Sequence, residues 1–493
     1  MVNRQFKILC ATGYPGMDAL LQSEKCPNMN VVDICRSKAD VRELIKKHDP
    51  EILLVADKLA GDDSIINMMI ALKKAHPYLR IIYLAGGLDP KDQARKDALG
   101  ALVLSGIFDI VTEKKINIDY VVDVIENPIS YESVSYLAKS IVDGKTEAAN
   151  AYGGLEWNDY GEYDELIEEH NNIFVFTSIK PGTGKSVVST NVACALARFG
   201  VNKEGKQPRV ALIEADLQTL SVGTMLGVVE DKYYNLGTAL RSAASVFDRG
   251  NIIADDEKVK HVNTTIRNCF VEYSEQPNLR ILSGSMLTPE EIDSLKVEPE
   301  YYSFILDAIR DDYDYIIVDL NSSVFHVTTF TLLQAAKICF YILNLDYNNV
   351  RNNIRYRATL EAFSISDKIK YVLNQNIENT PDFESFGVGI EPLIFTGDKI
   401  EKEFFHISVR IPSLPLSIQL NRQFEGVPAS FDKDPEPVVD RFRLAILEIV
   451  KCFADPGKEY EKVYNRVNKK KVGFFAKIGS PFSGNKKKEE VKE

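Results

Sequence analysis

The stretch from Asn172 to Gly200 constrains the fold more than any other part of the chain. It opens with Ile173 to Phe176, an apolar run of β-branched and aromatic residues that predicts a buried parallel strand. Apolar residues at helical spacing follow from Val187 to Phe199 and stop at a glycine, which predicts a helix. A loop with two glycines, Lys180-Pro-Gly-Thr-Gly-Lys-Ser186, joins the two elements. Strand, loop and helix in this order predict a phosphate-binding loop in an α/β sheet.

The residue types of this loop suit an anion. Gly182 and Gly184, on either side of Thr183, let backbone N–H groups turn towards a phosphate, and the helix N-terminus adds its partial positive charge. Lys185 supplies a cation for the β- and γ-phosphates, and Ser186 supplies a hydroxyl for Mg²⁺. We predict that these residues bind the phosphates and the metal ion.

The loop departs from the ordinary P-loop pattern G-x-x-x-x-G-K-[ST], which would need glycine where this chain has Ile179. It fits the deviant form K-G-G-x-G-K-[ST], with Lys180 as the additional lysine and Pro181 in place of the first glycine. In this it resembles the MinD/ParA class of P-loop ATPases. The resemblance implies ATP and Mg²⁺ as cofactors. It also implies that Lys180 reaches the nucleotide of a facing subunit, so that ATP drives formation of a homodimer.

Two later strands end in acidic residues, and the carboxyl end of a strand faces the ligand crevice in open α/β sheets. The first carries Glu214 and Asp216, where the class has D-x-D. By resemblance Asp216 orients the attacking water, and Glu214 fills the first acidic position as a further Mg²⁺ ligand. Both acids could instead merely cap the strand end. The second strand ends at Asp319 in a Walker B pattern, which assigns Asp319 to Mg²⁺. The class continues with a proline-bearing loop, whereas this chain has residues 320–323, Leu-Asn-Ser-Ser.

The base of the nucleotide has its own candidate contacts. Relatives use an asparagine at a strand end to bind adenine, so Asn374 is a candidate; a plain turn asparagine fits the sequence equally well. The segments 411–415 and 421–428 resemble the late I-P-x-x and G-x-P segments of the class, which lie near the base.

The first 138 residues contain five short apolar runs that alternate with helix-like segments, which implies a doubly wound α/β domain with a parallel sheet. The layout resembles a response-regulator receiver domain without its chemistry. Ala56 takes the phosphoacceptor position, Glu113 stands where a lysine is required, and residues 11–12 offer no acidic pair. Asp57 and Lys114 each lie one residue late, so a register slip could restore part of the site. We expect a docking or dimerisation module.

The chain is expected to divide into four segments: the receiver-like domain (1–138), an acidic and flexible linker (139–170), the MinD/ParA-like ATPase domain (171–453) and a basic tail (454–493). The fold class is therefore α/β, with two doubly wound parallel-sheet domains and a flexible tail. In the tail, lysines surround Phe474, Phe475 and Ile478, a composition that can bind anionic lipid. Gly473 and its neighbouring breakers favour a disordered, solvated segment instead.

Composition limits the compartment and the partners. The 493 residues carry a net charge of −12, which argues against a nucleic-acid partner. The sequence shows no apolar run of about 18 residues and no signal-peptide core at its start, so we expect a cytoplasmic location. Contact with the inner face of the membrane is a further hypothesis, carried by the tail.

The combination of a receiver-like domain and this type of ATPase resembles the TadZ/CpaE pilus-assembly proteins. That resemblance implies an ATP-dependent dimeric switch, with slow ATP hydrolysis, that organises a pilus or secretion machine at the membrane or cell pole. Three alternatives stay open: a scaffold that binds ATP without turnover, a ParA-type DNA-partition ATPase, and a bacterial tyrosine kinase. The last would need a C-terminal tyrosine cluster, but the tail offers only Tyr460 and Tyr464.

Overall fold

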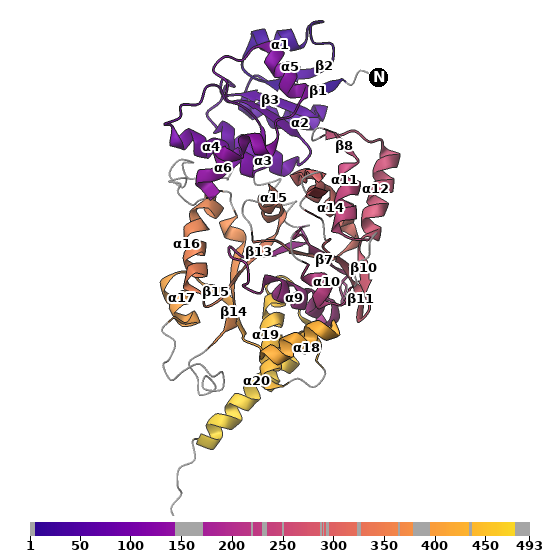
Figure 1. Ribbon diagram of the computed structural model, residues 1–493, viewed down its shortest axis with the longest axis vertical. Coiled ribbons are helices and arrows are strands. Elements are labelled where there is room, and N and C mark those ends of the chain that lie inside the picture. Colours follow the sequence, from indigo (N-terminus) through magenta and orange to yellow (C-terminus); the bar gives the residue numbers. More distant parts are fainter. Residues whose placement is uncertain are drawn as a thin grey trace, which may run out of the picture.

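The computed structural model describes residues 5–142, 171–217, 220–228, 234–248, 251–285, 288, 290–291, 295–322, 327–362, 365–377, 395–432 and 436–478. These residues form two α/β units that are stacked along the long axis of the molecule, with helix α20 projecting from the far end (Figure 1).

The N-terminal unit is a five-stranded parallel sheet with the strand order β2-β1-β3-β4-β5. This is the doubly wound order 2-1-3-4-5 of flavodoxin-like folds, as the alternating pattern predicted. The strands are β1 (Phe6–Ala11), β2 (Met29–Ile34), β3 (Ile52–Ala56), β4 (Arg80–Leu84) and β5 (Asp109–Val111). The helices are α1 (Pro15–Leu21), α2 (Val41–His48), α3 (Ile65–Ala75), α4 (Gln93–Leu104), α5 (Ile118–Glu126) and α6 (Tyr131–Val142).

The C-terminal unit is built on an eight-stranded sheet with the order β10-β11-β7-β12-β6-β13-β14-β15. Its pairings are parallel except for β10, which is antiparallel to β11. The strands are β6 (Ile173–Thr177), β7 (Val210–Glu214), β10 (Val271–Tyr273), β11 (Gln276–Leu282), β12 (Tyr315–Asp319), β13 (Ile338–Leu343), β14 (Ile369–Asn376) and β15 (Ile407–Pro412). A small hairpin, β8 (Phe247–Asp248) and β9 (Asn251–Ile252), lies outside this sheet.

Helices cover both faces of the large sheet. On one face lie α9 (Lys185–Phe199), α19 (Pro437–Lys451) and part of α20 (Gly457–Ile478); on the other lie α11 (Leu236–Ala244), α12 (Asp256–Asn268), α14 (Pro299–Ile309) and α15 (Val327–Ala335). Further helices are α10 (Val222–Met225), α16 (Tyr347–Ala362), α17 (Gly397–Glu403) and α18 (Leu416–Glu425). Because helices cover both faces of the sheet, strand β6 is buried on both sides. Ile173 and Val175 belong to the hydrophobic core on one face, and Phe174 and Phe176 belong to the core on the other. Burial on both faces explains its unbroken apolar run.

The two units share one hydrophobic core cluster and a buried ion pair. Lys73 of α3 and Glu300 of α14 are 8% and 6% exposed, and Lys73 Nζ lies 2.6 Å from Glu300 Oε1. Removing one partner of such a pair leaves an uncompensated buried charge, which costs about 3–5 kcal/mol. The N-terminal unit is therefore packed firmly against the C-terminal unit.

Two boundaries differ from the sequence expectation. Helix α6 reaches Val142 and so includes the first residues that were assigned to the linker; residues 143–170 lie outside the described residues. In the tail, α20 is helical through Ile478, so the prediction of disorder is wrong for this stretch. Val463 is buried, and Arg466 Nη2 pairs with Asp440 Oδ1 at 2.7 Å. These contacts with α19 anchor a helix in which Gly473 is tolerated at a cost of about 1 kcal/mol.

Glu298, which precedes α14 at the domain junction, should make stability depend on pH. Burial, and secondarily the nearby Glu300 charge, raise its pKa from 4.5 to about 7, with Asp109 acting in the same direction and Lys73 and Arg80 opposing them. A carboxyl group whose pKa is raised on folding stabilises the native state below its unfolded pKa, and this contribution is lost as the pH rises through the folded pKa.

We therefore expect the melting temperature of the full chain to fall between about pH 5 and pH 8, and Glu298→Gln to reduce this fall by about 2–4 °C. Differential scanning calorimetry across this range measures the effect. The exposed Glu275→Gln serves as the control. Equal pH profiles for wild type and Glu298→Gln would contradict the assignment.

Candidate functional site

The loop between β6 and α9 has the conformation that phosphate binding requires. Gly182 and Gly184 have φ angles of 80° and 84°, in the left-handed region that lets successive N–H groups point to one side. The Ser178 hydroxyl donates to the Lys180 carbonyl oxygen at 2.7 Å and closes the loop. Thr183 is buried, and its hydroxyl has no partner among the described residues. The loop geometry is compatible with a phosphate cradle, and phosphate binding by these residues stays a prediction.

The structure brings the P-loop lysine together with two of the predicted acids. Lys185 Nζ lies 3.6 Å from Asp216 Oδ2 and 4.0 Å from Asp319 Oδ2, and all three side chains are at most 12% exposed. They meet because β7, β12 and β6 are neighbours in the sheet and run parallel, so their carboxyl ends share one edge. The arrangement places one cation between two carboxylates where a triphosphate would lie.

The Asp319 carboxylate suits a divalent cation. It is completely buried, and neither oxygen completes a regular hydrogen bond within the part of the chain that the structure describes. Burial raises its pKa to about 6, and the Lys185 charge and the Ser186 hydroxyl only partly offset that effect. A buried carboxylate without donors beside a hydroxyl matches the oxygen ligands that Mg²⁺ prefers. Asp319 and Ser186 would therefore hold Mg²⁺, as the sequence predicts.

Glu214 requires a correction to its predicted role as an Mg²⁺ ligand. Its carboxylate is fully buried and accepts hydrogen bonds from backbone N–H groups: Val222 and Gly284 donate at 2.8 Å, Gly223 at 3.5 Å, and Ser221 also donates. Both oxygens are occupied by these donors, which the strand sequence alone does not reveal. The geometry assigns Glu214 to holding the start of α10 and the backbone at Gly284 in place.

Lys180 is held within its own chain. Its Nζ pairs with Asp346, which directly precedes α16 and also accepts the Asn348 N–H at 2.8 Å. This hydrogen bond from Lys180 is the main reason that the pKa of Asp346 is lowered. Sequence analysis missed Asp346; the available signal was an aspartate between the end of β13 and a helix start, the ordinary N-cap pattern.

Asn374 lies at the P-loop. Its amide donates to the Thr183 carbonyl oxygen at 2.9 Å, and the side chain is 5% exposed. A Cβ atom on Gly184 would come within 2.3 Å of Asn374 Nδ2. In this structure Asn374 therefore braces the loop, while its predicted contact with adenine stays a prediction.

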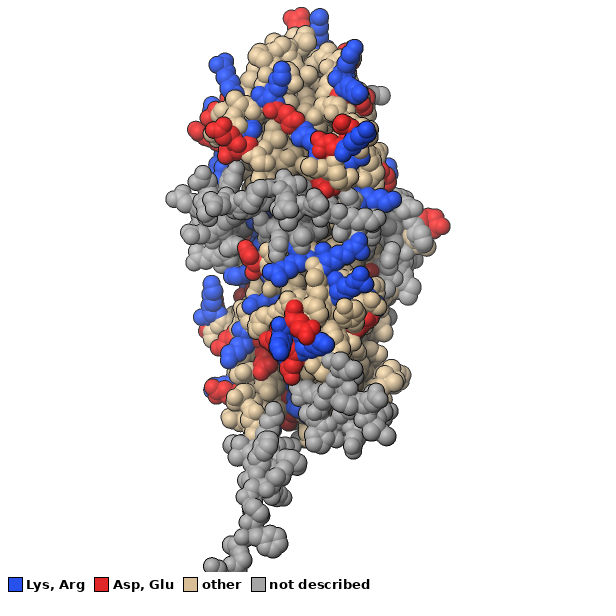
Figure 2. All heavy atoms as spheres, turned by 90° about the vertical axis from the view of Figure 1, so that its left-hand side faces the viewer, with Lys and Arg blue, Asp and Glu red and all other residues tan. Residues whose placement is uncertain are grey.

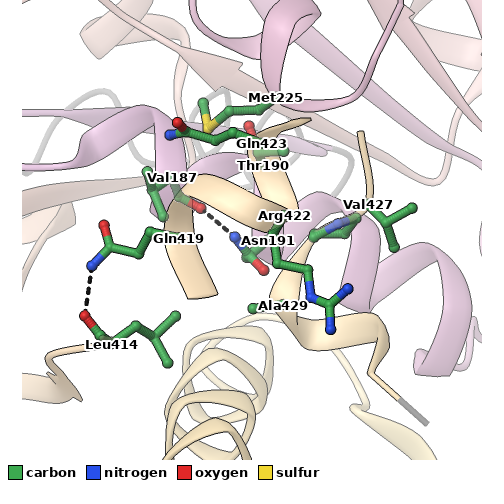
Figure 3. A pocket seen from close by; sticks show the side chains of 11 residues that line it. Val187, Thr190, Asn191, Met225, Leu414, Gln419, Arg422, Gln423, Val427 and Ala429 are labelled. Atoms are coloured by element: carbon green, nitrogen blue, oxygen red, sulfur yellow. Dashed lines mark hydrogen bonds between the residues drawn. The ribbon is translucent and has the colours of Figure 1, made fainter. Parts of the chain in front are cut away.

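A pocket lies beside the N-terminal half of α9 (Figure 3). Its lining residues come from α9, α10, α18 and the flanking segments: Val187, Thr190, Asn191, Met225, Leu414, Gln419, Arg422, Gln423, Val427, Pro428 and Ala429. Asn191 donates to the Val187 carbonyl oxygen at 2.9 Å, and Gln419 donates to that of Leu414 at 2.7 Å. The segments predicted to lie near the base thus contribute to a pocket that Val187, Thr190 and Asn191 of α9 also line, while their contact with a base stays a prediction.

The N-terminal sheet has no comparable cluster. Asp57, after β3, pairs with Arg95 Nη2 at 2.5 Å and also accepts a hydrogen bond from the Tyr83 hydroxyl. Asp18 accepts from Thr12 at 2.7 Å, and burial raises its pKa. Over the described ranges, no group of three or more histidine, cysteine or acidic side chains is placed to hold a metal ion. Asp57, the candidate for a slipped phosphoacceptor, is therefore already engaged by a cation.

Comparisons with known proteins agree on the C-terminal region. A family profile described as an AAA domain matches residues 171–350. The septum site-determining protein MinD of Synechocystis sp. is 25% identical over 205 residues, which cover 42% of this chain and 65% of that protein. The MinD of Thermotoga maritima is 23% identical over 205 residues, covering 41% and 64%. The chain thus spans slightly less than two thirds of these relatives.

Solved structures with a similar arrangement include a ParA family ATPase from Chlorobium tepidum TLS, with a TM-score of 0.42 and 20% identity over 56% of this chain and 96% of that one. The septum site-determining protein MinD of Pyrococcus horikoshii, solved with Mg-ADP, gives a TM-score of 0.41 and 18% identity over 58% and 99%. By the profile and the sequence relatives, the C-terminal region is similar to P-loop ATPases of the MinD/ParA type.

Gly184→Ala should abolish nucleotide binding, because the new methyl group would collide with Asn374 and push the P-loop out of shape. We expect the affinity for a fluorescent ATP analogue to fall more than about tenfold. Gly205→Ala is the matched control, since Gly205 has a similar φ of 77° but open space around a Cβ. It should lose about 1 kcal/mol of stability and bind nucleotide normally. Equal affinities for both variants would disprove the bracing role of Asn374.

Proposed function

We propose that this chain is an ATP-dependent dimeric switch with slow ATPase activity. The observation that carries the proposal is the convergence of Lys185, Asp216 and Asp319 on the P-loop. Lys185 and the loop N–H groups would bind the β- and γ-phosphates, and Asp319 and Ser186 would hold Mg²⁺, which supplies charge neutralisation. Asp216 would orient the water that attacks the γ-phosphorus while the bond to the ADP oxygen breaks.

Lys180 links nucleotide binding to association. In the single chain its charge is neutralised by Asp346, and its side chain is 42% exposed. Exchange of Asp346 for the phosphates of a nucleotide bound in a second copy would free Asp346 and complete that copy's site. ATP would then contribute directly to the dimer interface, and its binding energy would drive association.

The cellular role that we propose is the organisation of a pilus or secretion machine at the membrane. Support comes from the joining of a doubly wound N-terminal domain without receiver chemistry to a MinD/ParA-type domain. Among helices within the described ranges, none has the length and apolar character to cross a bilayer. Membrane contact would therefore be peripheral, through the basic end of α20 and the residues after it.

A scaffold that binds ATP without turnover is the alternative that the structure favours most, because Lys180 is already paired within the chain. A DNA-partition ATPase receives less support. On the face shown in Figure 2, lysine and arginine side chains alternate with aspartate and glutamate over both domains. A DNA footprint would need a continuous basic surface.

The switch predicts that ATP·Mg²⁺ converts the monomer into a dimer, measured by light scattering, with phosphate release followed in the same samples. Lys180→Ala should abolish the dimer, and Asp216→Ala should keep the dimer but lower phosphate release by at least about tenfold. Asp346→Asn keeps an oxygen to accept the Asn348 N–H and frees Lys180, so it should lower the ATP concentration needed for dimers.

Lys206→Ala, which changes an exposed lysine elsewhere on the domain, is the control and should behave as wild type. If the molecular mass does not change with ATP and no phosphate is released, the switch hypothesis is wrong and the scaffold hypothesis takes its place. ATP-driven dimers without turnover would retain the switch and remove the ATPase activity.

From the lysines and aromatic residues of the tail, we predict that the chain binds vesicles that contain phosphatidylglycerol in a flotation assay. A chain ending at Asn468 keeps Val463 and Arg466 packed on α19 and loses the lysines and aromatic residues that follow. We expect the full chain to float and the shortened chain to stay in solution, with about 0.5 M salt releasing the full chain. Equal flotation of both chains would remove the tail as the contact.

A further inference from the structure

Helix α14 lies between the N-terminal domain and strand β7 (Figure 1). Glu300, Phe304 and Asp307 follow one another at helical spacing and lie on the face towards the N-terminal domain. Glu300 pairs with buried Lys73, and Asp307 accepts a hydrogen bond from the Tyr78 hydroxyl at 2.5 Å. Both of these polar contacts thus reach the part of the N-terminal domain that runs from α3 to β4.

Aromatic packing fixes the same face. The Tyr78 ring lies 6.5 Å from the Phe304 ring and 5.8 Å from the Phe247 ring, measured between centroids. Phe247 and Phe304 in turn lie 5.7 Å apart. Lys73 also donates to the Pro77 carbonyl oxygen at 2.8 Å, so the segment that carries Tyr78 is tied to the ion pair. Docking of the N-terminal domain and the position of α14 are therefore mechanically linked.

The opposite face of α14 contacts the segment that carries Asp216. Tyr302 is 1% exposed, and its hydroxyl donates to the Ala215 carbonyl oxygen at 3.4 Å. The Ala215 N–H donates to the Asp319 carbonyl oxygen at 2.9 Å. Ala215 is thus held on one side by α14 and on the other by the end of β12. Asp216 is the residue that follows directly in the chain.

We propose that the docked N-terminal domain, acting through α14, sets the position of Asp216, with Tyr302 as a positioning residue. This inference rests on the proposed function of Asp216. It gives the N-terminal domain a defined task, since a change in its docking alters turnover without altering the contacts that bind ATP. A partner protein that binds the N-terminal domain can thereby change the rate of ATP hydrolysis at the site in the C-terminal domain.

Hydrogen exchange and kinetics on the full chain distinguish a change in the position of Asp216 from a loss of overall stability. Tyr302→Phe removes only the hydroxyl, and the neighbouring Tyr301→Phe is its matched control, because Tyr301 packs on Phe247 through its ring. We expect Tyr302→Phe to speed exchange of the Ala215 amide at least about threefold, and Tyr301→Phe to leave it unchanged. The turnover number should fall about three- to tenfold, with the affinity for ATP within about twofold of wild type.

The N-terminal side is tested by Lys73→Met, which leaves Glu300 buried without its cation, and by the double variant Lys73→Met with Glu300→Met. The single variant should speed Ala215 exchange and lower turnover, and the double variant should restore both, because two apolar groups replace the pair. Lys25→Met, on an exposed loop of the same domain, should change neither.

Unchanged Ala215 exchange in Tyr302→Phe and in Lys73→Met would overturn the inference. If Lys73→Met fails to fold, Tyr302→Phe decides the matter alone, because it removes a single oxygen. If the wild-type chain binds no ATP, the proposed function itself is wrong. The exchange measurement would still show whether α14 connects the two domains.

Discussion

The buried charge cluster of Lys185, Asp216 and Asp319 is the constraint on which the rest of the C-terminal domain depends. An ammonium group that is only 12% exposed is tolerable only with carboxylates beside it, and these carboxylates come from two different strands. The three groups meet because β7, β12 and β6 are adjacent and parallel, and that order is maintained by cores on both faces of the sheet. The single charge of Lys185 offsets only one of the two carboxylate charges; in the proposed function, Mg²⁺ held by Asp319 would offset the other.

Much of this could be predicted from the sequence, because the signals are local. The unbroken apolar run of β6, the glycines of the loop and the helical spacing of α9 all lie within one short stretch, so strand, loop and helix were predicted correctly. Asp216 and Asp319 follow buried runs that end at the same edge of the sheet, which is why their meeting with Lys185 could be anticipated. The antiparallel edge strand β10 is only three residues long and gave no periodic signal of its own.

The rest depends on contacts between distant parts of the chain. Glu214 and Asp216 look alike in sequence, two acids at one strand end, yet Glu214 is surrounded by N–H groups from residues 221–223 and 284 while Asp216 lies beside Lys185. The different partners of these two acids depend on contacts with residues far away in the sequence, which no local pattern shows. The pairing of Lys180 with Asp346, and of Lys73 with Glu300, is hidden for the same reason. In the tail, packing of Val463 and Arg466 on α19 outweighs the helix-breaking tendency of Gly473.

The two domains place their buried charges differently, and this difference bears on how they can work together. In the N-terminal domain Asp57, at the carboxyl edge of the sheet, is paired with Arg95, so that edge is not poised for phosphate chemistry. Its buried Lys73 is instead directed at Glu300 of the neighbouring domain. A buried charge tolerates little displacement from its partner, because any gap leaves both groups poorly solvated. The N-terminal domain therefore cannot shift far on α14 without loss of this pair, and α14 cannot shift without disturbing Ala215 through Tyr302. A domain without receiver chemistry of its own is in this way rigidly connected to the residue beside Asp216.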